Sequence, residues 1–66
     1  MTITVNGAEA ALDPGGSVRD LLTSMGLPDQ GIAVAVDGAV VPRSRWGSVA
    51  LADGTAVEVV TAVQGG

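Results

Sequence analysis

The pair Asn6-Gly7, placed between two stretches of alternating side chains, constrains the fold of this chain more than any other feature. Asn-Gly is the preferred pair for a two-residue type I′ turn, which joins the strands of a tight hairpin. Such a turn sets Val5 opposite Ala8, and this register assigns every side chain to one face. The apolar face then carries Ile3, Val5, Ala8, Ala10 and Leu12. One face of the hairpin must therefore lie on a core.

Residues 17–26 predict a short amphipathic helix. Ser17 suits the N-cap, and Asp20 stands where an acid completes a capping box. Gly26 suits the left-handed residue after a helix, and Pro28 prevents the helix from resuming. The apolar stripe is expected to contain Val18, Leu21, Leu22 and Met25. Because so short a helix is not stable alone in water, it must pack this stripe on the hairpin.

The second half of the chain predicts two more strands around Asp37-Gly38, an irregular connector over 43–54 and a last strand over 55–63. Pro42 ends the fourth strand, which is short. The order β-β-α-β-β-β indicates an α+β fold of the β-grasp, or ubiquitin-like, kind. In it, a mixed sheet of four to five strands packs on one helix, and the first and last strands are central neighbours. We therefore expect a domain over residues 1–61 and a flexible C-terminal tail over 62–66.

Missing residue types narrow the chemistry of the chain. It has no cysteine and no histidine, so thiolate nucleophiles, the usual metal ligands and the commonest general base are absent. Its aspartates stand at turns and caps, where they suggest no acid–base catalysis. The net charge of −4, with three arginines and no lysine, argues against nucleic acid and anionic membranes. No apolar run is long enough to span a bilayer and no signal pattern begins the chain, so a cytoplasmic location is expected.

The chain ends on Gly65-Gly66, directly after the expected last strand. Glycine is 10 of 66 residues, so a terminal pair arises by chance about 2% of the time. A glycine pair can thread a channel too narrow for other residues, and its terminal carbonyl is the least hindered one available to a nucleophile. A carboxylate needs activation, usually by attack on the α-phosphorus of ATP with Mg²⁺. Since the chain lacks a phosphate-binding loop motif, another protein must bind the ATP.

The sequence resembles the ThiS family of sulfur carrier proteins of thiamine biosynthesis over nearly its whole length. The resemblance is carried by "VNG", "SVRDLL", "VAVDGAVVPRSRW", "LADGTAVEVV" and the terminal "GG". It implies a protein cosubstrate that is not an enzyme and binds no cofactor itself. A ThiF-like adenylyltransferase would adenylate the Gly66 carboxylate with ATP and Mg²⁺. Sulfur from a cysteine desulfurase would then make a thiocarboxylate, which donates sulfur to the thiazole synthase ThiG.

The tail is the expected reactive segment. An extended tail of about four residues reaches roughly 13–14 Å, enough to place Gly66 in a partner's buried site while the body stays outside. We expect Ala62, Val63 and Gln64 to form a semi-ordered neck, with Gly65 and Gly66 as the mobile tip. Val63, Gln64 and Gly65 would insert into the partner. Gln64 stands where relatives often carry a small residue, which bears on the width of the partner's channel.

Two further groups of residues are candidate docking contacts. Ubiquitin-like proteins commonly dock through the outer face of the sheet, where a shallow apolar patch is expected. Its members are Ala33, Ala35, Glu58 and Val60. Arg43 and Arg45 are candidate contacts to ThiF or to a phosphate-bearing ligand, although exposed arginines most often form weak surface pairs. Trp46, the single aromatic residue, is expected to anchor the connector by packing.

Two other functions stay open. A sulfur carrier of molybdopterin or cysteine synthesis would share the chemistry, but such chains tend to be longer and lack "VVPRSRW". A passive β-grasp interaction module or a ubiquitin-like modifier would use the fold without the sulfur. The absence of lysine excludes chain-building on itself, but it does not exclude attachment to other proteins. In each case a monomer with heteromeric partners is expected.

Overall fold

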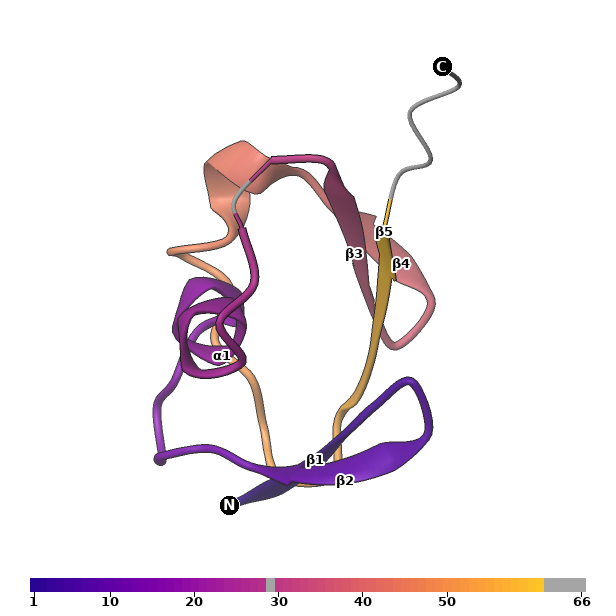
Figure 1. The fold of residues 1–66 in the computed structure, drawn as a ribbon. Coiled ribbons are helices and arrows are strands. Elements are labelled where there is room, and N and C mark those ends of the chain that lie inside the picture. Colours follow the sequence, from indigo (N-terminus) through magenta and orange to yellow (C-terminus); the bar gives the residue numbers. More distant parts are fainter. Residues whose placement is uncertain (29, 62–66) are drawn as a thin grey trace.

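The fold is a curved mixed sheet with a helix on one face (Figure 1). The computed structural model describes residues 1–28 and 30–61. Its elements are β1 (Thr2–Val5), β2 (Ala8–Ala11), α1 (Val18–Ser24), β3 (Ile32–Val36), β4 (Ala39–Val41), the 3₁₀ helix η1 (Arg43–Arg45) and β5 (Ala56–Thr61). The strand order is β2-β1-β5-β3-β4, with β1 and β5 parallel and the other pairs antiparallel. The predicted β-grasp fold, with first and last strands as central neighbours, is confirmed.

Two turns of the same kind close the two hairpins. Asn6 has a φ of 53° and Asp37 a φ of 49°, and each is followed by a glycine with positive φ. Positive φ at both central residues defines the type I′ turn, whose twist matches that of the flanking strands. Val5 pairs with Ala8 as predicted. Ala8 itself is exposed, because it lies beside the turn at the end of the hairpin, so the predicted apolar face is shorter than expected.

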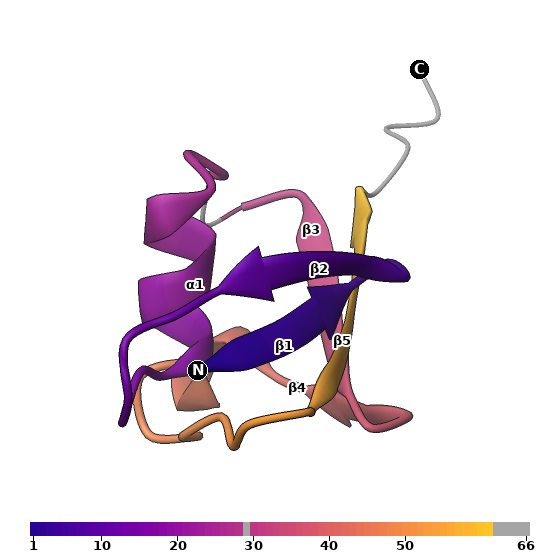
Figure 2. The ribbon, with the colours of Figure 1, turned by 90° about the horizontal axis from the view of Figure 1, so that it is seen from below.

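The capping box at the start of α1 is present as predicted. The Ser17 hydroxyl accepts from the Asp20 N–H at 3.2 Å, and the Asp20 carboxylate accepts from the Ser17 N–H at 2.9 Å. The predicted apolar stripe is wrong at one position, since Met25 is 43% exposed. The helix ends at Ser24 and Met25 is its C-cap, so that side chain falls after the last turn that packs on the sheet. Figure 2 shows α1 standing on one side of the sheet.

The core fills the space between α1 and the inner face of the sheet. Its buried side chains are Ile3, Val5, Leu12, Val18, Leu21, Leu22, Val34, Trp46, Leu51 and Val57. Trp46 is 2% exposed, and its indole N–H donates to the Val41 carbonyl at 2.9 Å. The predicted packing role of Trp46 is therefore confirmed. In residues 1–28 and 30–61, no helix has the length and apolar character needed to cross a bilayer.

Candidate functional site

The strand that leads into the predicted reactive tail lies in the centre of the sheet. β5 pairs with β1 on one flank and with β3, as far as Thr61, on the other. The pairing with β3 reaches Thr61, the last residue of β5, whereas the pairing with β1 ends at Val57. Ala62, Val63, Gln64, Gly65 and Gly66 lie outside the described residues, so the neck, the inserted residues and the thiocarboxylate site stay predictions.

The sheet face that points away from α1 carries a shallow, mainly apolar hollow of about 170 Å³. We call its surface residues the outer-face patch, which consists of Ala33, Ala35, Val40, Glu58 and Val60. Strand pairing brings them together, because Ala33 lies opposite Val60 and Ala35 lies between Glu58 and Val40. Val40 and Val60 are 76% and 62% exposed. The structure thus gathers the four residues expected on this face, while their docking role stays a prediction.

Val40 is the member of the outer-face patch that the sequence reasoning missed. Its signal is present in the sequence, since a two-residue turn at Asp37-Gly38 sets Val40 directly opposite Ala35. Residues opposite each other in a hairpin share a face. Val40 also supplies the most exposed of the large hydrophobic side chains among the described residues.

The structure places the two predicted arginine contacts away from the outer-face patch. Arg43 and Arg45 are exposed on η1, and neither lines the hollow on the outer face. Trp46 follows them directly and is buried, with the guanidinium carbon of Arg19 5.6 Å from its ring centroid. That distance is typical of a cation–π contact. Arg43 and Arg45 thus lie on η1, outside the lining of the hollow on the outer face, and the sequence-predicted docking residues form two separate groups.

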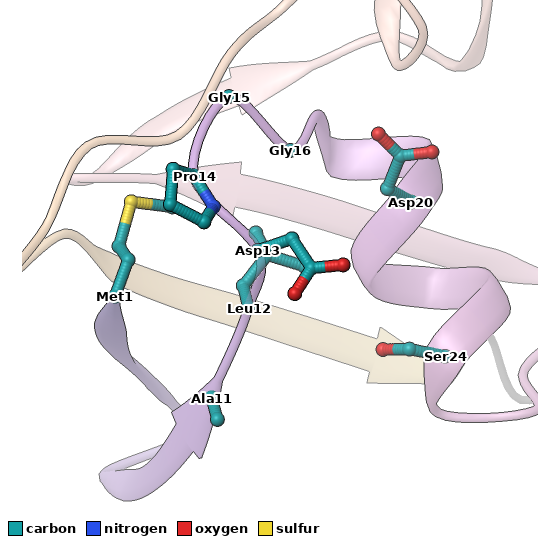
Figure 3. Close-up of a pocket in the computed structure, with 9 residues that line it drawn as sticks. All are labelled: Met1, Ala11, Leu12, Asp13, Pro14, Gly15, Gly16, Asp20 and Ser24. Atoms are coloured by element: carbon teal, nitrogen blue, oxygen red, sulfur yellow. The ribbon is translucent and has the colours of Figure 1, made fainter.

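A larger hollow, of about 630 Å³, lies between α1 and residues 13–16 (Figure 3). The carboxylates of Asp13 and Asp20 and the hydroxyl of Ser24 are arranged around its opening, and no lysine or arginine lines it. Two of these groups already serve the helix, since Asp20 accepts from Ser17 and the Ser24 hydroxyl donates to the Leu21 carbonyl at 2.8 Å. Carboxylates repel the phosphates of a nucleotide, so this hollow is a poor candidate for an ATP site. The described part of the chain holds no group of three or more acidic side chains that suits a metal ion.

Two solved structures of thiamine biosynthesis proteins are similar to this chain over its whole length. The crystal structure of the thiamine biosynthesis protein ThiS from Geobacter metallireducens superposes with a TM-score of 0.84 and 29% identity, covering 100% of both chains. The NMR structure of a thiamine biosynthesis protein from the same organism gives a TM-score of 0.77 at 29% identity, covering 100% of this chain and 88% of the other.

Comparison of sequences leads to the same family. A thiazole synthase from Paramagnetospirillum magneticum is 32% identical over 66 residues, which are 100% of this chain and 20% of that protein. The chain thus spans a fifth of the length of this curated relative. The model of the ThiS family matches residues 3–66. Because that match takes in nearly every residue, including the last, the chain belongs to the ThiS family.

Proposed function

We propose that this protein is a sulfur carrier of thiamine biosynthesis that holds sulfur as a thiocarboxylate on Gly66. The observation that carries the proposal is the family match, which runs from residue 3 through the body to Gly66. The likeness to a thiamine biosynthesis protein over the full chain supports it. A chain without cysteine has no thiol to hold sulfur as a persulfide, so the acyl end is the chemically suitable place.

The proposed loading reaction takes place on a ThiF-like adenylyltransferase, which supplies ATP and Mg²⁺. A carboxylate oxygen of Gly66 attacks the α-phosphorus of ATP, and pyrophosphate leaves with the electrons of the broken bond. A persulfide sulfur, derived from a cysteine desulfurase, attacks the carbonyl carbon of the adenylate, and AMP leaves. Reduction of the resulting acyl disulfide by a thiol yields the thiocarboxylate.

The proposed acceptor of the sulfur is the thiazole synthase ThiG. The chain is 32% identical to a segment of a protein named thiazole synthase, which supports a functional link with that chemistry. In this role the protein is a cosubstrate, spent in each cycle and loaded again. A cytoplasmic location stays a prediction from the sequence.

The outer-face patch is the surface through which we propose that these partners hold the body. It contains two highly exposed valines, and such apolar groups are typical of interaction sites. Val60 belongs to the patch and is followed by Thr61, the last residue of β5. A partner bound there would lie next to the strand from which the tail begins.

The test is chain-dependent activation of ATP. Incubation of the full chain with a ThiF-like enzyme, ATP and Mg²⁺ should release pyrophosphate, and deletion of Gly66 should abolish the release. Intact-mass analysis of the protein from its own cells should show a fraction in which one oxygen is exchanged for sulfur. The same spectrum tests whether Gly66 is the final residue of the mature protein, as the proposal requires.

The alternatives predict different outcomes in the same experiments. A passive interaction module releases no pyrophosphate and carries no sulfur, and a ubiquitin-like modifier releases pyrophosphate but carries no sulfur. A carrier of molybdopterin or cysteine synthesis acquires the thiocarboxylate, but thiazole synthase does not accept its sulfur. Formation of the thiazole ring from the loaded chain therefore separates the proposed function from each of these alternatives.

A further inference from the structure

The side chain of Asn6 pairs with both backbone polar groups of Val59, which lies 53 positions further along the chain. The amide oxygen of Asn6 accepts from the Val59 N–H at 2.9 Å, and its Nδ2 donates to the Val59 carbonyl at 3.1 Å. The backbone N–H of Asn6 donates to the Val57 carbonyl at 2.9 Å. The amide side chain thus takes the place that another residue of β1 would occupy in the ladder.

This pairing is needed because β5 continues past the end of β1. β1 ends at Val5, which lies opposite Val57, while β5 runs on to Thr61. Alternate residues of a strand direct their polar groups to the same flank, so Val59 faces the β1 side as Val57 does. There the hairpin has already turned, and the side chain of Asn6, in that turn, bonds to Val59. On the opposite flank, β3 pairs with β5 as far as Thr61.

The second hairpin shows why this position carries an amide and not an acid. Asp37 occupies the same place in its turn, and its carboxylate accepts from the Ala56 N–H at 3.1 Å. The Ala56 carbonyl accepts from the backbone N–H of Asp37 at 2.8 Å, so an acceptor is sufficient there. At Val59 both groups rely on the side chain of Asn6. An asparagine amide has an acceptor and a donor, whereas an aspartate has only acceptors.

We propose that Asn6 is a positioning residue that fixes the end of β5, and with it the point and direction from which the reactive terminus starts. The inference rests on the proposed function, since it concerns how the Gly66 carboxylate reaches a partner's site. Gly66 follows Val59 by seven residues, and Val60 of the outer-face patch is adjacent to Val59. If the strand end frays, a docked body would present its terminus in more orientations, and fewer of them would be productive.

The two hydrogen bonds between Asn6 and Val59 are exposed to solvent, which distinguishes a positioning role for Asn6 from a role in overall stability. Both hydrogen bonds are exposed, so water replaces part of what is lost when they are removed. Their loss should therefore change the position of the strand end more than the folding of the body. The outer-face patch stays intact, so binding of the body to a partner should be preserved.

The test compares two variants of Asn6 with a control that weakens another part of the fold. Asn6→Asp keeps a turn-forming pair but sets a carboxylate oxygen against the Val59 carbonyl, and Asn6→Gly removes both bonds without adding charge. Ser17→Ala removes the N-cap of α1, away from β5. The three full-length variants are compared by thermal unfolding, by hydrogen exchange of the amides of β5, and by pyrophosphate release with a ThiF-like enzyme, ATP and Mg²⁺.

Both Asn6 variants should lower kcat by about tenfold with KM changed less than about twofold, the pattern of lost positioning. In both Asn6 variants, the amide hydrogens at the end of β5 should exchange faster than in wild type. Ser17→Ala should retain the wild-type kcat. The inference is overturned if Ser17→Ala lowers kcat as much at equal stability, or if the Asn6 variants raise KM alone. It is also overturned if wild type releases pyrophosphate and the Asn6 variants have the same kcat as wild type. No pyrophosphate release from wild type would refute the proposed function itself, and the inference with it.

Discussion

Gly16 lies where the turn after β2 passes close to the core, and the space beside it has no room for a side chain. A Cβ on Gly16 would lie 2.8 Å from the Cγ of Leu12 and 3.0 Å from the Asp13 carbonyl oxygen. Leu12 belongs to the core, and the Gly16 N–H donates to that same carbonyl at 3.0 Å. Any larger residue at this position therefore disturbs a core side chain and a turn together.

Gly16→Ala should lower the free energy of unfolding by about 1–3 kcal/mol, the usual cost of overpacking. Gly47 provides the matched control, because no atom lies within 4 Å of a Cβ placed there. Gly47→Ala should change the free energy of unfolding by less than about 0.5 kcal/mol. Urea unfolding followed by circular dichroism measures both variants. Equal stabilities would mean that Leu12 moves aside without cost.

At the scale of elements, α1 depends on its surroundings, because seven residues are too few for a stable isolated helix. The connector between β4 and β5 satisfies two of the N–H groups that a helix start leaves unpaired. Val18 donates to the Val49 carbonyl at 3.0 Å, and Arg19 donates to the Trp46 carbonyl at 3.1 Å. The connector, for which the sequence predicts an irregular structure, thus contributes side chains to the core and accepts hydrogen bonds from the start of the helix.

The corrected stripe of α1 predicts unequal effects at two neighbouring apolar positions. Leu22 is 3% exposed and Met25 is 43% exposed. Leu22→Ala should cost about 2–5 kcal/mol of unfolding free energy, because it opens a cavity in the core. Met25→Ala should cost less than about 1 kcal/mol.

Urea titrations of the two variants under the same conditions decide the question. A slope equal to that of wild type allows the change in midpoint to be read as a change in stability. A Met25→Ala cost as large as that of Leu22→Ala would show that Met25 packs with the core in solution.

At the scale of the whole molecule, the two faces of the sheet differ in burial. The inner face holds the buried side chains together, including Val34 and Val57. The outer face exposes Val40 and Val60, which contribute little to the core. A substitution on the outer face can therefore test partner binding while the fold is preserved.

Val60→Arg should raise the KM of the chain for a ThiF-like enzyme by about tenfold, the loss typical of a central interface contact. The unfolding midpoint should stay near that of wild type, because the side chain is 62% exposed. Ala11→Arg is the matched control. It makes the same change of charge at an exposed position on β2, the edge strand farthest from β4.

Steady-state pyrophosphate release gives KM and kcat for both variants. Similar KM values for Val60→Arg and Ala11→Arg would remove Val60 from the docking surface. If both variants have a KM above that of wild type by the same factor, the change in net charge explains the effect.

Local patterns in the sequence were sufficient to predict most of the elements and part of the candidate site. The hairpin turns and the capping box follow from residues a few positions apart, as does the alternation of faces within each strand, whereas the pairing of β3 with β5 brings Ala33 and Ala35 beside Glu58 and Val60. Val40 could have been added from the same register. The chemistry assigned to Gly66 was reached from the terminal glycines and the family resemblance, and it lies outside what the structure describes.

The sequence by itself determined the turns, the caps, the alternation of faces and hence the β-grasp fold, because each depends on steric and hydrogen-bonding preferences between near neighbours. Only the tertiary structure decided that Met25 is exposed, that the connector bonds to the start of α1 and that Asn6 pairs with Val59. Those features depend on where one element ends relative to another that is distant in the chain. The pairing of Asn6 with Val59 exists because β1 stops short while β5 continues, and no local pattern encodes that difference in length.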